Sequence, residues 1–140
     1  MAWVQKMKIT KTVLESILVH AKRDMPKEAC GYLASRDGVI CGHYELTNLD
    51  QASDHFSMDP KEQFAAIKDM RAQGMQMAAV YHSHPETPAR PSDEDIRLAF
   101  DPAISYVIIS MAAQEGVVKS FKIRKGEVTL EQMEIVEGEQ

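Results

Sequence analysis

The sequence predicts an α/β domain in which a mixed, curved β-sheet is flanked by helices. Its 140 residues, 44% hydrophobic and 26% charged, have the balance of a globular protein with one core. Segments with the apolar spacing of a helix also alternate with short apolar runs bounded by glycine and proline, as strands are. We find no repeat, low-complexity tract or linker, so we expect one domain over residues 1–140.

The first helix is expected to begin near Thr12, because Thr12-Val13-Leu14-Glu15 fits a capping box. It should end before Pro26. Two strands are expected next, over residues 29–35 and 39–46, with a tight turn at Asp37-Gly38 between them.

A second helix is well marked at its start, with Asp59 as N-cap and Pro60 at the first helical position. Gly74 is a natural stop for it. Residues 77–81 then predict a buried strand that leads directly into His82.

A short third helix should open at Ser92, after a proline-containing loop. Residues 104–110 form an apolar run typical of a central strand. Two further strands, over residues 117–123 and 128–135, are expected on either side of a turn at Lys125-Gly126. Together these elements predict a three-layered α/β domain.

Charge and cysteine usage narrow the function classes. The formal net charge of -5 argues against nucleic acid as a partner. No run approaches the ~20 apolar residues that cross a membrane, and residues 1–8 do not resemble an export signal. Folding the first hairpin would set Cys30 near Glu45 and Cys41 near Ala34, so we expect two free thiols and a cytoplasmic protein.

The segment Tyr81-His82-Ser83-His84-Pro85 carries the chemistry. Side chains two apart on a strand point to the same face, so His82 and His84 should be able to share one metal ion. Asp95, in the first turn of the third helix, is the nearest further ligand. Two nitrogens and one carboxylate oxygen leave a fourth position for water, which is the pattern of a catalytic zinc.

Other interpretations of these residues stay open at this point. Ser92-Asp93-Glu94-Asp95 is also an ordinary N-capping sequence. Two histidines and a carboxylate also suit non-haem iron, and His43 and His55 are weighed as additional ligands.

The spacing resembles a known family. His82-Ser83-His84-Pro85, six residues, Ser92, two residues and Asp95 is similar to the JAMM motif of the MPN+ metallopeptidases. The segment 26–33 resembles the upstream strand that carries the family's glutamate, which places it at Glu28. Residues 56–60 resemble the entry to the family's second helix. The resemblance implies an MPN domain with a layering like that of cytidine deaminases.

The resemblance also implies roles. His82, His84 and Asp95 would hold one zinc ion, Glu28 would be the general base and then the acid, and Ser92 would donate a hydrogen bond to the oxyanion. Short bacterial and archaeal members are associated with ubiquitin-like sulfur-carrier proteins, which suggests hydrolysis after a C-terminal Gly-Gly. A non-catalytic MPN scaffold and another metal-dependent hydrolase are the alternatives, and the oligomeric state, including a homodimer, is left open.

Overall fold

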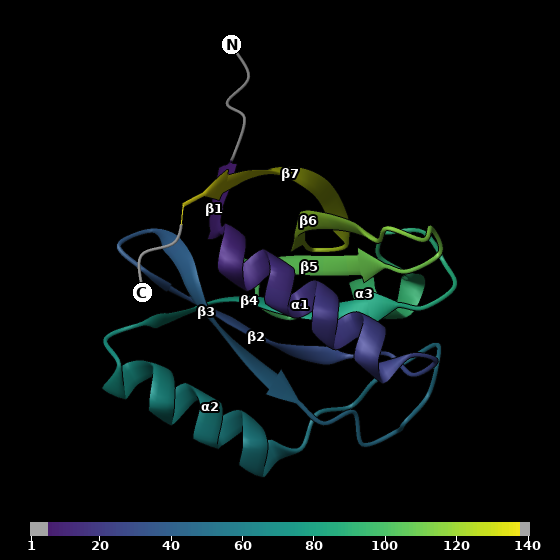
Figure 1. Cartoon of the computed structure of the whole chain (residues 1–140), viewed down its shortest axis with the longest axis horizontal. Helices are drawn as coiled ribbons and strands as arrows, with labels where there is room; N and C mark the ends of the chain where they lie inside the picture. The colour runs from purple at the N-terminus through teal and green to yellow at the C-terminus, as the bar shows by residue number, and fades with distance from the viewer. Residues whose placement is uncertain (1–5, 138–140) are drawn as a thin grey trace.

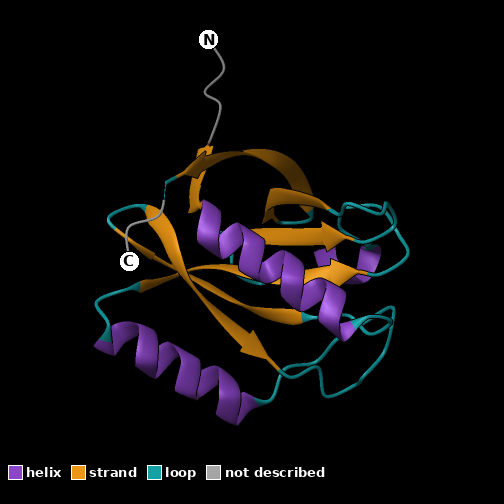
Figure 2. Ribbon diagram, viewed as in Figure 1, coloured by secondary structure: helices purple, strands orange, loops and turns teal. Residues whose placement is uncertain are grey.

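The computed structural model describes residues 6–137, so the outermost residues of the expected domain, 1–5 and 138–140, lie outside the described part of the chain. Part of the segment compared with an export signal is among them. Figures 1 and 2 show the elements in space. In chain order they are β1 (Lys6–Thr10), α1 (Lys11–Asp24), β2 (Cys30–Arg36), β3 (Val39–Leu46), α2 (Pro60–Ala72), β4 (Gln76–His84), α3 (Asp93–Arg97), β5 (Ser105–Ser110), β6 (Val117–Arg124) and β7 (Glu127–Val136).

The strands form one mixed sheet in the order β1-β3-β2-β4-β5-β6-β7, which confirms the expected mixed sheet. Strand β2 is antiparallel to β3 and β4, whereas β4 and β5 run parallel. The sheet also closes into a barrel, because β1 is parallel to β7 on one side and to β3 on the other. Sequence analysis did not predict this closure, since it assigned no strand before the first helix.

Strand β1 is short but alternates as a strand should: Met7 and Ile9 are buried, and Lys6 and Lys8 are exposed. It leads directly into α1, so the helix begins earlier than predicted. The N-cap is Thr10, whose hydroxyl oxygen accepts a hydrogen bond from Val13 N at 3.2 Å. The capping box predicted at Thr12 was wrong, because β1 ends at Thr10 and that residue, two positions earlier, caps the helix.

The two faces of the sheet carry different helices. Apolar residues of α1 pack with Leu33, Ala79 and Tyr81 on one face. Side chains alternate along a strand, so Cys30, Tyr32 and Ala34 lie on the other face, where α2 covers them. Ile96 of α3 packs on this second face as well, in a cluster with Ile108. The α2/α3 face is the one that carries the site described below.

The remaining local predictions hold with small shifts. Asp59 caps α2, and Pro60 is its first residue. Strand β4 extends to His84 and so includes both histidines of the motif. Cys30 and Cys41 are free thiols, as expected. Among the helices of residues 6–137, none has the length and apolar character that a bilayer crossing requires.

Candidate metal centre

The two motif histidines project from the end of β4 onto the α2/α3 face. His82 lies opposite Cys30 of β2 and beside Ile108 of β5, both of which belong to this face. Each histidine has 5% of its surface exposed. Buried imidazoles need polar partners, and these two are directed toward the same point.

The third predicted ligand comes from α3. Ser92 is the N-cap of this helix, and its hydroxyl oxygen accepts a hydrogen bond from Asp95 N at 3.0 Å. In return, Ser92 N donates to Asp95 Oδ2 at 2.9 Å. This capping box orients the Asp95 carboxylate toward the histidines. The capping interpretation and the ligand interpretation of this segment are therefore compatible.

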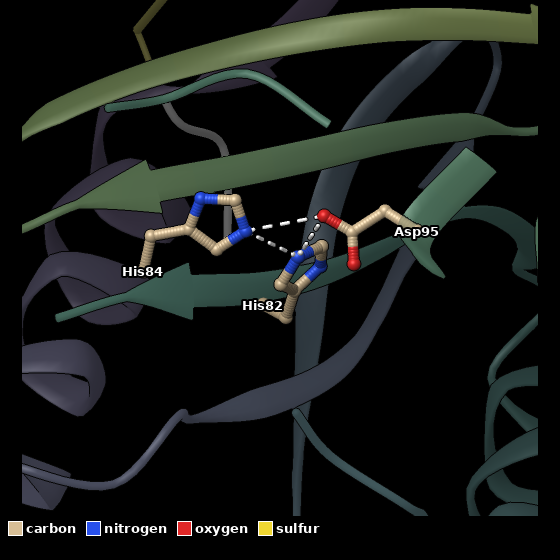
Figure 3. A group of neighbouring side chains, drawn as sticks. All are labelled: His82, His84 and Asp95. Atoms are coloured by element: carbon tan, nitrogen blue, oxygen red, sulfur yellow. Dashed lines mark hydrogen bonds and ion pairs between the residues drawn. The ribbon is translucent and has the colours of Figure 1, made fainter. Parts of the chain in front are cut away.

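The three side chains meet at one point, as Figure 3 shows. His82 Nε2 lies 3.1 Å from His84 Nε2, and Asp95 Oδ2 lies 3.1 Å from each of these nitrogens. This is the group of His, Cys, Asp or Glu side chains in the described part of the chain whose donor atoms are close enough to share a metal ion. Two imidazoles and one carboxylate form a donor set suited to zinc, with room left for a further ligand.

The hydrogen bonding of His84 supports this fit. Its Nδ1 lies 2.9 Å from the carbonyl oxygen of Pro88, which can only accept, so Nδ1 carries the proton. In the neutral ring Nε2 then presents a lone pair toward His82 Nε2 and the carboxylate of Asp95. Converging lone pairs and a negative charge favour a cation between them.

Hydrogen bonds between Asp95 and the two histidines favour the charged forms of Asp95 and His84. Burial by itself would raise the pKa of Asp95, but hydrogen bonding to His82 and His84 holds it well below the usual range. Burial would lower the pKa of His84, but the hydrogen bond with Asp95 raises it above the ordinary value. The carboxylate therefore stays ionised at neutral pH, as a metal ligand must.

Glu28, which resemblance alone had singled out, is buried just before β2, with 4% of its surface exposed. Its backbone is held on both sides: Glu28 N donates to Ala52 O at 2.7 Å, and its carbonyl accepts from Asn48 Nδ2 at 3.1 Å. Its carboxylate oxygen Oε1 has no hydrogen-bond partner. Glu28 lines a cavity together with His84 and Ser92, so the structure brings all five predicted site residues to one region.

The surroundings of Glu28 disfavour its charge. Burial raises the pKa of Glu28 to about 8, and the negative charges of Asp95 and Asp54 add to this effect, while His84 opposes it. A divalent cation at the neighbouring ligand atoms would favour the ionised form. A carboxyl group poised in this way can both accept and donate a proton near neutral pH.

Ser83 links the backbone next to Glu28 to the metal-binding strand. Ser83 N donates to Ala29 O at 2.9 Å, and Ala29 N donates to Ser83 Oγ at 2.8 Å. Ser83 is fully buried on the face opposite the two histidines, as the strand pattern predicted. Because Ala29 follows Glu28 directly, this pair of hydrogen bonds fixes where the Glu28 backbone lies relative to His82 and His84.

An apolar groove of about 480 Å³ borders the centre, where His82 and Asp95 line it. The ring of Phe56 stacks on the imidazole of His82, with centroids 4.8 Å apart. The further apolar lining of the groove comes from the residues that follow α3 and from the sheet: Val80, Leu98, Phe100, Tyr106, Ile108 and Ile123. Sequence analysis noted Phe56 only as part of a family segment, because no local pattern shows which aromatic residue meets a distant histidine.

The two other histidines weighed as ligands have other partners. His43 Nε2 is 3.3 Å from Glu45 Oε2, and His55 Nδ1 is 2.7 Å from Asp54 Oδ1. Neither belongs to the group that could share a metal.

Comparison with known proteins places the chain. Residues 10–124 match the family of prokaryotic homologs of the JAB domain. The chain belongs to this family. It is 33% identical over 132 residues to the CysO-cysteine peptidase of Mycobacterium tuberculosis, an alignment that covers 92% of this chain and 90% of that protein.

Solved structures agree with this JAB-domain assignment. The protein DSY2949 of Desulfitobacterium hafniense has a TM-score of 0.85 and 52% identity, covering 93% of this chain and 92% of its own. A structure described as a JAMM metalloprotease-like zinc site in the proteasome and signalosome has a TM-score of 0.60 and 26% identity, covering 95% of this chain and all of its own. The fold of this chain is thus a JAB/MPN fold, in which the expected mixed sheet and flanking helices are found.

Proposed function

We propose that this JAB-family chain is a zinc-dependent peptidase or isopeptidase that hydrolyses the amide bond after the C-terminal Gly-Gly of a ubiquitin-like sulfur-carrier protein. The observation that carries the proposal is the convergence of His82 Nε2, His84 Nε2 and Asp95 Oδ2, beside the buried carboxylate of Glu28. The relative named CysO-cysteine peptidase supports amide hydrolysis as the reaction.

In this proposal His82, His84 and Asp95 hold one zinc ion, which when bound would polarise the scissile carbonyl and lower the pKa of water. Glu28 takes the proton from the attacking water and later delivers it to the leaving nitrogen. The Ser92 hydroxyl donates a hydrogen bond to the oxygen that becomes negative. Ser92 Oγ can do so because its hydrogen bond with Asp95 N uses the hydroxyl only as an acceptor.

The test is metal content and turnover measured together. The substrate is a ubiquitin-like carrier whose Gly-Gly is extended by a further residue. We expect about one zinc per chain, cleavage after Gly-Gly, loss of cleavage on chelation and recovery on adding zinc. A chain purified without chelator that holds no zinc, and gains no activity when zinc is added, would sink the proposal in favour of a scaffold. Recovery with ferrous iron alone would favour the other metal-dependent alternative.

Ser83→Ala tests the fastening of Glu28. The change leaves the buried Ala29 N–H without its acceptor, so we expect a loss of about 1–3 kcal/mol in stability. Because Glu28 is then less well placed, kcat should fall several-fold while zinc content stays constant.

Ser83→Thr keeps the hydroxyl and serves as the control, which should retain most of the turnover. If a folded Ser83→Ala protein has the parent's kcat, Ser83 does not position Glu28.

A further inference from the structure

Asn48 is a buried residue of the loop between β3 and α2, and it has 6% of its surface exposed. Its Nδ2 donates to Glu28 O and to His55 O, each at 3.1 Å. Its Oδ1 accepts from Asp50 N at 3.0 Å and from Ser57 N at 3.1 Å. An amide has two N–H donors and two acceptor positions, so the whole capacity of this side chain is used on backbone groups.

The β3–α2 loop closes on itself around this amide. Leu49 N donates to Ser57 O at 2.8 Å, and Asn48 forms an isolated β-bridge with Met58. The loop also accepts a hydrogen bond from Glu28 N, at Ala52 O. Both backbone hydrogen-bonding groups of Glu28 are therefore paired with this one loop, the N–H directly and the carbonyl through the Asn48 side chain.

The same loop contacts a metal ligand. Phe56 lies between the two loop residues that bond to the Asn48 amide nearest to it, and its ring stacks on the imidazole of His82. A continuous path of contacts thus joins the backbone of Glu28 to the metal position. This path is separate from the one through Ser83, which reaches Glu28 from β4.

The backbone matters for Glu28 because its carboxylate is weakly held. Oε1 is buried and has no hydrogen-bond partner, so no contact at this atom aims it. A general base works only within hydrogen-bond reach of the proton it takes. A displacement of about 1 Å can lower a rate by about 10²-fold. Whatever holds the Glu28 backbone therefore affects the rate.

We propose that Asn48 is a positioning residue for the reaction of Glu28: its amide joins the Glu28 backbone to the β3–α2 loop and so fixes this carboxyl group relative to the metal position. The inference rests on the proposed function. Asn48 is not one of the residues whose donor atoms converge at the metal position, and it acts only through Glu28. Sequence analysis did not single it out, because its decisive partner lies 20 residues earlier in the chain.

Asn48→Ala removes all four hydrogen bonds of the amide. In the zinc-loaded protein we expect kcat for cleavage of the extended carrier to fall by about 10- to 100-fold, with KM and zinc content close to those of the parent. Ser120→Ala is the control for a general loss of stability. Ser120 is fully buried and donates to Glu131 Oε1 at 2.7 Å, but it lines neither the groove nor the cavity beside Glu28. This variant should keep the parent's kcat.

A double-mutant cycle with Glu28→Gln separates positioning from a structural role. Because Asn48 acts through Glu28, Asn48→Ala should slow single turnovers of Glu28→Gln by less than about 3-fold. An equal slowing of the parent and of Glu28→Gln, or a parent-like kcat in Asn48→Ala, would overturn the inference.

If Asn48→Ala does not fold, Asn48→Asp replaces it in the cycle. The carboxylate keeps the two acceptor bonds and lacks the N–H groups that bind Glu28 O and His55 O. The same slowing is expected in the parent background, and again little in Glu28→Gln. A parent that cleaves no carrier would instead overturn the proposed function, and this inference with it.

Discussion

Glu28→Gln is expected to lower kcat for cleavage by about 10²- to 10⁴-fold while leaving about one zinc per chain. The amide has nearly the shape of the carboxyl group but cannot accept a proton from water at neutral pH. Glu28 is not one of the three residues whose donor atoms converge at the metal position, so metal binding should persist. Single-turnover rates and metal content, measured on the same preparations, check both parts. Turnover equal to that of the parent would remove Glu28 from the mechanism.

The same substitution should stabilise the metal-free protein. The folded-state pKa of Glu28 is raised from 4.5 to about 8, so the native state binds a proton that the unfolded state releases between these pH values. The contribution of Glu28 to the free energy of unfolding is fully present below pH 4.5 and falls as the pH rises to 8. The loss reaches on the order of a few kcal/mol, and a neutral glutamine avoids it.

Denaturant unfolding in the presence of chelator, from pH 4.5 to 8, measures this difference. The free energy of unfolding of Glu28→Gln, relative to that of the parent, should rise steadily across that range. Glu86→Gln changes an exposed carboxylate that lines the same cavity as Glu28, and its free energy of unfolding should not rise relative to that of the parent. A constant difference between Glu28→Gln and the parent at all pH values would mean that Glu28 is ionised in the fold. Gain of stability with loss of turnover would show that this carboxyl group is kept for chemistry and not for folding.

Asp95→Asn is the second change with a large expected effect. The amide keeps the size of the side chain, and its oxygen can still accept from Ser92 N, so helix α3 should still form. It lacks the negative charge that lies 3.1 Å from both imidazole nitrogens. Losing an outer partner of a metal ligand already costs about 10- to 100-fold in affinity, and losing the ligand charge should cost more. Turnover should fall in parallel.

Asp93→Asn is the matched control, because Asp93 is exposed in the same helical turn and is not part of the metal-binding group. Competition with a chelator of known zinc affinity measures the zinc affinity of each variant. Parent-like zinc affinity in Asp95→Asn, together with lost turnover, would contradict its role as a ligand.

Much of this protein could be predicted from local sequence. Pro60 after Asp59, and Ser92 before three acids, mark helix starts that require only neighbouring residues, because capping is a hydrogen bond between residues two or three apart. His82 and His84 could be paired for a similar reason, since the repeat of a strand puts alternate side chains on one face. Asp95 followed from its spacing to this pair, and Glu28 only from its likeness to a family.

Tertiary structure decided what depends on distant contacts. Strand β1 forms because a five-residue segment pairs with β3 and β7. The sequence of the segment alone does not show that it has these partners. The two hydrogen bonds between Ser83 and Ala29 join residues far apart in the chain and bring Glu28 to the metal strand. The separation of an apolar groove from the cavity beside Glu28 also arises only when α3, the loop before it and the segment before α2 meet at the end of β4. Short-range hydrogen bonds and strand periodicity thus determined the ligand pair, whereas packing between remote segments determined the chemical environment around it.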